Sequence, residues 1–303
     1  MIFSTSRWCI TFIYGVKGKR SMDIKKKVLI DLKFTYKSIK KSWKLLILNS
    51  GLDFLFLVAI SIATTLVQLR MFDHLYQLLQ MIGEQTGGLI NSLTDPTMPT
   101  LVGISNNPTF QFHFNQVLIY LAILFIVLFI LWVLFQGTIW WLTHKIVGHK
   151  LKFSSYMNSF FLESVLFFAI FGVSIFFFLQ SYVNTGLSLS SVISLFQLRI
   201  GYVIFLLLVL YFASMSYSSK GYDAKQNLKD AFVKGTKGFL GMLPALVIIL
   251  AFFFLFLPFI WNAIFLYLGK WVSFIFGLLV FIPSFTIARV LFVRTMSKLP
   301  KDL

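Results

Sequence analysis

The chain has 303 residues, of which 58% are hydrophobic and only 12% are charged. An ordinary soluble domain carries about twice that share of charge, so this composition indicates a polytopic membrane protein. The net charge of +17 is explained better by basic loops beside membrane spans than by nucleic-acid binding, and the single cysteine, Cys9, excludes an intramolecular disulfide.

Residues 1–43 are predicted to form a basic cytoplasmic arm. The first 21 residues lack a basic leader and a cleavage site, so we interpret them as a mobile tail or a mis-called start before Met22. Residues 24–44 alternate apolar and basic positions at helical spacing, which is typical of an amphipathic helix on an anionic leaflet; a simple charged anchor is the alternative. The lysines expected to contact lipid are Lys25, Lys26, Lys27, Lys33 and Lys37.

Residues 44–303 are predicted to form an all-α domain of six transmembrane helices with amphipathic helices on the cytoplasmic surface. The clearest span contains residues 117–135, which lack charge, Gly and Pro and would cover roughly 28 Å as a helix. The expected spans are 45–67, 116–142, 160–179, 198–217, 239–261 and 271–292. Residues 68–115 are expected to begin with an interfacial helix and to continue as a loop, and 218–238 to form another interfacial helix.

The distribution of basic residues predicts the topology. Of the 27 Lys and Arg residues, 24 fall on one side of the six spans, and only Arg70, Arg199 and Lys270 fall on the other. The positive-inside rule therefore predicts a multi-pass cell-membrane protein with both termini in the cytoplasm.

Three segments before odd-numbered spans have a similar pattern, a polar stretch with aromatic residues followed by an apolar run. They read FTYKSIKKSWKLLIL, FSSYMNSFFLESVLFF and NLKDAFVKGTKGFLGMLPALVII. With its six spans and the third of these stretches, the chain resembles poorly characterised prokaryotic six-span families, such as the membrane domain that accompanies some glycerophosphodiester phosphodiesterases. In that family the chemistry lies in a separate soluble domain, so the resemblance implies membrane residence and little more.

The sequence contains no recognisable catalytic, cofactor or metal motif. His144 and His149 lie five residues apart around Gly148, and we interpret them as surface imidazoles; His74 and His113 are interpreted in the same way. No Cys/His zinc spacing, phosphate-binding loop or nucleophile–base set is found. We therefore expect no metal, no cofactor and no enzymatic activity.

Polar residues inside the predicted spans are the informative ones, because charge at membrane depth is costly and usually faces the bundle interior. From the cytoplasmic end, Glu163 is expected about 5 Å deep and Asp53 about 12 Å deep, with Arg289 in the same leaflet half as the best partner of Asp53. The candidate ligand-binding residues are Asn49, Asp53, Gln136, Glu163 and Arg289. A purely structural cluster that fixes helix packing is the alternative.

These observations lead to two hypotheses of function. The first is an integral membrane protein that handles a small solute or a lipid through a polar cavity facing the cytoplasm. The second is a scaffold or membrane-homeostasis protein that does not transport and that binds anionic lipids or a membrane-protein partner. Neither hypothesis involves nucleic acid.

Overall fold

The computed structural model describes residues 20–91, 107–186, 191–219 and 223–298. These residues are almost entirely helical and contain no strand, which confirms the all-α fold. Five helices are long and apolar enough to cross a membrane, and a bent pair raises the number to six. The chain is a multi-pass membrane protein. The sequence-based interpretations of residues 1–19 lie outside the described residues.

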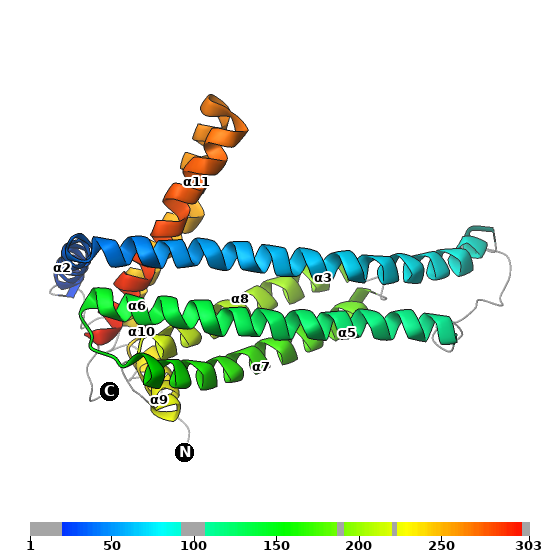
Figure 1. The fold of residues 1–303 in the computed structure, drawn as a ribbon, viewed down its shortest axis with the longest axis horizontal. Helices are drawn as coiled ribbons and strands as arrows, with labels where there is room; N and C mark the ends of the chain where they lie inside the picture. The colour runs from blue at the N-terminus through cyan, green and yellow to red at the C-terminus, as the bar shows by residue number, and fades with distance from the viewer. Residues whose placement is uncertain (1–19, 92–106, 187–190, 220–222, 299–303) are drawn as a thin grey trace, which may run out of the picture. The chain divides into compact units, whose positions relative to one another are not determined.

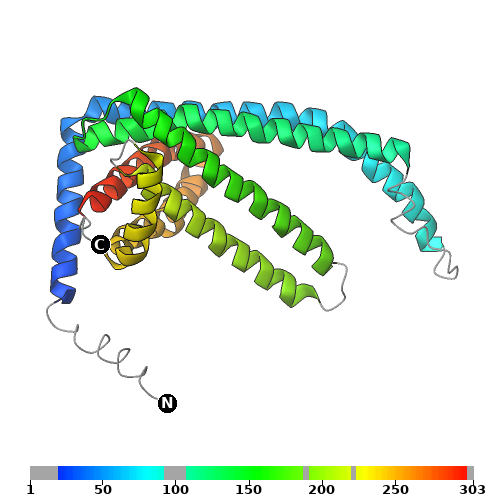
Figure 2. The same ribbon diagram turned by 90° about the horizontal axis from the view of Figure 1, so that it is seen from below.

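The first half of the chain contains the longest of the described helices. Helix α2 (Arg20–Lys41) is followed at once by α3 (Trp43–Asn91), and Figure 2 shows the chain turning sharply between the two. Helix α5 (Pro108–Leu131) continues through a five-residue π-helix, Trp132–Gln136, into α6 (Gly137–Val147). Asn107 caps the start of α5, because its side-chain oxygen accepts a hydrogen bond from the Thr109 amide at 2.9 Å.

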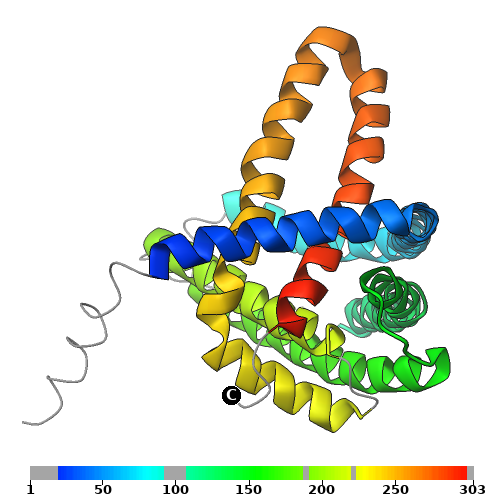
Figure 3. The ribbon, with the colours of Figure 1, turned by 90° about the vertical axis from the view of Figure 1, so that its left-hand side faces the viewer.

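The second half of the chain contains two helical hairpins. Helices α7 (Phe153–Gly186) and α8 (Ser191–Tyr217) run antiparallel, and the amphipathic α9 (Ala224–Lys237) follows them (Figure 1). Helix α10 (Phe239–Ala251), the π-helix Phe252–Phe256 and the first part of α11 (Leu257–Ser297) lead to Gly269, where the chain reverses (Figure 3). Gly269 has φ 80° and ψ 172°, a conformation that essentially only glycine adopts.

The contacts divide the chain into two compact units, Met1–Asp53 with Gly137–Leu303, and Phe54–Gln136. In the first unit, α2 packs against α11, α6 and α10, while α9 packs against α7, α8 and α10. The two basic helices α2 and α9 therefore both contact α10. In the second unit, Phe56 packs its ring against Trp132 and Phe135.

The structure corrects two of the expected boundaries. Residues 68–91 do not form a separate interfacial helix or a loop, because α3 continues unbroken over 49 residues. The expected span 239–261 is not one regular helix, since a π-helix interrupts it and apolar helix continues past residue 261 to the reversal at Gly269. Pro283 lies inside α11 without disturbing its backbone angles, which are non-helical only at Gly269.

The three similar segments before the odd-numbered spans differ in backbone form. The first and third contain elbows, at Ser42 between α2 and α3 and at Gly238 before α10, where the axes of α9 and α10 differ by 93°. The second has no elbow, because residues 153–186 form the single helix α7.

The α11 hairpin depends on the absence of a side chain at Gly277. A Cβ atom at this position would lie 1.6 Å from a ring carbon of Trp261 on the other arm. We expect Gly277→Ala to lower the melting temperature of the purified protein, since overpacking of this kind costs about 1–3 kcal/mol. Gly201→Ala in α8 is the control, because no atom lies within 4 Å of the added Cβ. Equal melting temperatures for the two variants would contradict the close packing of the arms.

Candidate functional site

Two networks of buried polar side chains lie in the unit formed by residues 1–53 and 137–303. The Asp53 network comprises Asn49, Ser50, Asp53, Thr143, Thr286 and Arg289. The Glu163 network comprises Ser159, Glu163, Ser216 and Asn227.

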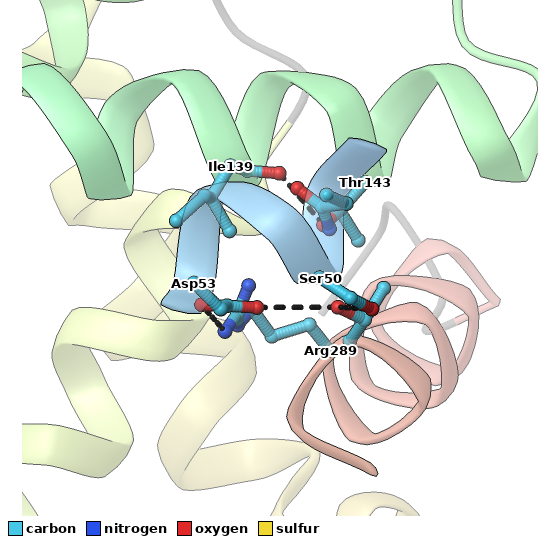
Figure 4. Close-up of polar contacts among 7 residues, drawn as sticks. Ser50, Asp53, Ile139, Thr143 and Arg289 are labelled. Carbon is cyan, nitrogen blue, oxygen red and sulfur yellow. Dashed lines mark hydrogen bonds and ion pairs between the residues drawn. The ribbon is translucent and has the colours of Figure 1, made fainter. Parts of the chain in front are cut away.

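The Asp53 network joins α3, α6 and α11 (Figure 4). Arg289 donates from Nη2 to Asp53 Oδ1 at 2.5 Å, and Thr286 donates to Asp53 Oδ2 at 3.2 Å. One turn earlier on α3, Asn49 donates to the Thr143 hydroxyl at 3.2 Å. Asn49 and Asp53 are four residues apart on α3, and Thr286 and Arg289 are three apart on α11. Residues at these spacings share a helix face, which explains the arrangement. The predicted pairing of Asp53 with Arg289 is confirmed.

The Glu163 network joins α7, α8 and α9. Ser159 and Asn227 donate to Glu163 Oε1 at 2.8 and 2.7 Å, and Ser216 donates to Oε2 at 2.6 Å. Glu163 is only 1% exposed. Neither of the two ion pairs among the described residues involves Glu163, so three neutral groups hold this carboxylate without a cation.

A third set of contacts closes the end of α8. The last carbonyl groups of a helix have no partner within it, and Tyr217 is the final residue of α8. Its carbonyl accepts hydrogen bonds from the Tyr156 hydroxyl at 2.9 Å and from His144 Nε2 at 3.0 Å. His144 Nε2 must therefore carry hydrogen, because a carbonyl only accepts.

Two consecutive residues of α6 form hydrogen bonds to two different helices of this unit. Thr143 bonds to Asn49 of the Asp53 network, while His144 bonds to the end of α8, beside Ser216 of the Glu163 network. Both side chains are fully buried. Helix α6 is therefore hydrogen-bonded both to Asn49 on α3 and to the end of α8.

The expected gathering of five polar residues in one site is only partly reproduced. Asn49, Asp53 and Arg289 belong to one network and Glu163 to the other. Gln136 is buried at the end of the π-helix Trp132–Gln136, in the unit formed by residues 54–136. Glu163 does not pair with Arg289, whose guanidinium pairs with Asp53.

Sequence reasoning missed several members of these networks. Asn227 was assigned to a surface helix, and His144 was interpreted as a surface imidazole, yet both are buried. A signal for Asn227 was available, because Ala224, Asn227, Ala231 and Gly235 form a stripe of small residues along α9, and this stripe is its buried face.

The histidines form two pairs instead of lying singly on the surface. His144 Nδ1 lies 2.9 Å from His149 Nδ1, and His74 Nδ1 lies 2.9 Å from His113 Nδ1 in the other unit. His74 also stacks on Tyr120. Within the residues that the structure describes, no group of three or more His, Cys, Asp or Glu side chains is arranged to hold a metal ion.

No protein-family model, curated protein or solved structure matches this chain. The function must therefore be argued from the site alone.

Two hollows in the described residues lie apart from both networks. An open apolar groove of about 780 Å³ lies between α7 and α8, lined by residues such as Val173, Phe177 and Tyr202. A smaller hollow of about 590 Å³ lies at the basic link after α6 and is lined by residues that include Lys145, Lys150 and Lys152. Neither of these two hollows is lined by Asp53 or Glu163, whose side chains are 5% and 1% exposed.

Proposed function

We propose that this chain is a cell-membrane protein that binds and releases a proton or a small cationic solute at Glu163, on the basic, cytoplasmic side of the membrane. The observation that carries the proposal is the Glu163 carboxylate, which is 1% exposed and held by three neutral donors from α7, α8 and α9. Ionisable groups inside membrane spans are rare and most often mark ion or proton pathways.

The chemistry of the network suits such a ligand. Hydroxyl groups can donate to an ionised carboxylate and can also turn to offer oxygen to a cation or to a protonated carboxyl. Ser159 and Ser216 provide two such hydroxyls, within 2.8 Å of the two oxygens of Glu163. The same carboxylate can therefore exist in two charge states without losing its partners.

Access to Glu163 requires α9 to move. Asn227 on α9 bonds directly to the carboxylate, while Lys225 and Lys229 lie on the exposed side of the helix. Because α9 joins α10 through a 93° elbow at Gly238, a rotation there would expose the carboxylate to the basic surface.

An apolar carbodiimide, which modifies protonated carboxyl groups in membranes, tests this function. We expect mass spectrometry of the purified protein to find Glu163 modified at mildly acidic pH, and added Na⁺ or K⁺ to reduce the modification if a cation is the ligand. Asp53 is the internal control, because it is the other buried carboxyl group among the described residues and forms an ion pair with Arg289. Glu163→Gln should abolish the modification.

Failure of Glu163 to react at every pH and cation concentration would overturn the proposal. The burial of both carboxylates would then favour the second candidate, a scaffold that does not transport and that binds anionic lipids or a membrane-protein partner.

A further inference from the structure

We propose that the junction of α2 and α11 binds the phosphate group of an anionic membrane lipid, with Arg294 as the central ligand. This site is separate from Glu163 and does not depend on the function proposed for that residue. It uses a guanidinium that pairs with no carboxylate among the residues that the structure describes.

The Arg294 side chain lies flat against an aromatic ring. Its central carbon, Cζ, lies 3.6 Å from the centroid of the Phe34 ring on α2. Stacking of this kind fixes the plane of the guanidinium and leaves its edge to form hydrogen bonds. Arg294 is thus oriented before any ligand arrives.

The guanidinium has no polar partner among the described residues. Neither of their two ion pairs includes Arg294, and its side chain makes no hydrogen bond to them. Its Nε is buried without an acceptor, as is the hydroxyl of Thr35, which neighbours Phe34 and is 3% exposed. A buried charge-bearing group without an acceptor is costly, so an external anion that supplies one would be bound.

The surrounding charge is positive. Lys37 and Lys41 follow Phe34 by three and seven residues and therefore share its face of α2. Both lysines are exposed, and neither takes part in an ion pair with the described residues. Two lysines beside one stacked guanidinium favour a phosphate, whose oxygens accept hydrogen bonds from the paired N–H groups of arginine.

The position of α2 identifies the source of the phosphate. Helix α2 ends at Lys41, and the membrane-spanning α3 begins two residues later at Trp43. On the side of α2 next to its lysines, Leu32 and Tyr36 are 40% and 68% exposed, and Trp43 at the start of α3 is 54% exposed. An apolar stripe beside a basic stripe, at the end of a span, is typical of a helix at headgroup depth.

Titration of the full-length protein in non-ionic detergent with phosphatidylglycerol tests the site, with the melting temperature as the readout. We expect phosphatidylglycerol to stabilise the wild type, whereas phosphatidylcholine does not. Arg294→Gln should raise the lipid concentration for half-maximal stabilisation about tenfold. Lys37→Gln and Lys41→Gln, both at exposed positions, should raise it about fivefold. Arg294→Lys should give an intermediate value, because it keeps the charge and loses the planar fork.

Arg70→Gln is the charge-matched control, because Arg70 is exposed on α3 in the other unit. An equal loss for Arg70→Gln and Arg294→Gln would show general attraction of charge and overturn the site. Equal stabilisation by inorganic phosphate would overturn the assignment to a lipid.

The acidic residue nearest to Phe34 in the sequence is Asp31, three residues before it. If Asp31→Asn and Arg294→Gln lower the lipid-free melting temperature equally, and the double variant lowers it no further, Arg294 pairs within the chain and the proposal fails.

Discussion

Arg289→Leu is expected to destabilise the protein by about 3–5 kcal/mol, because it leaves the Asp53 carboxylate buried without a cation. Asp53 is 5% exposed and would keep only the hydrogen bond from Thr286. Asp53→Asn should leave the protein folded, since the amide oxygen can still accept from Arg289 and the guanidinium is partly exposed. Thermal unfolding of the purified variants measures the difference.

The double variant Asp53→Asn/Arg289→Gln is a second test of the ion pair. With both charges removed and both side chains still polar, it should recover part of the stability lost in Arg289→Leu. Arg70→Leu, at an exposed position on α3, controls for the loss of an arginine and should melt close to the wild type. If Arg289→Leu also melted like the wild type, the ion pair would contribute nothing to the fold.

Glu163→Leu is expected to release α9 from the bundle. The substitution removes the acceptor of three hydrogen bonds, from Ser159, Ser216 and Asn227, and each buried donor that loses its only acceptor costs on the order of 1–3 kcal/mol. Glu163→Gln should be milder, because its amide oxygen can still accept from Asn227 and Ser159. In a Cys9→Ser background, a cysteine at Ala231, which is fully buried on α9, reports this release through its rate of maleimide labelling.

The Ala231→Cys label should react slowly in the wild type and in Glu163→Gln, and faster in Glu163→Leu. A cysteine at Lys229, exposed on the same helix, is the matched control and should react at one rate in all three proteins. Slow labelling at Ala231 in Glu163→Leu would show that other contacts hold α9, such as the bond from the Tyr211 hydroxyl to the Gly235 carbonyl.

The sequence predicted the fold class well because long apolar runs have few alternatives in a membrane. It failed at residues 68–91, where polar side chains and Gly87–Gly88 indicated the end of a helix. A glycine in a helix interior costs only about 1 kcal/mol, and the nearest prolines, Pro96 and Pro99, lie beyond the last residue of α3. Helix α3 therefore continues through both glycines.

The Asp53 network was partly predictable, because few charges share one depth and opposite charges at membrane depth pair. The partners of Glu163 were not predictable in the same way. Ser216 and Asn227 reach it from α8 and α9, more than 50 residues along the chain. Their polarity alone also fitted an exposed position, so only the tertiary packing identifies them.

The consecutive placement of Thr143 and His144 on α6 has a mechanical consequence. Neighbouring residues of a helix point about 100° apart, so a rotation of α6 about its axis displaces both side chains at once. A rotation large enough to break the bond from Asn49 to Thr143 also withdraws His144 from the carbonyl of Tyr217. Rotation of α6 would therefore release its hydrogen bond to α3 and its hydrogen bond to the end of α8 together.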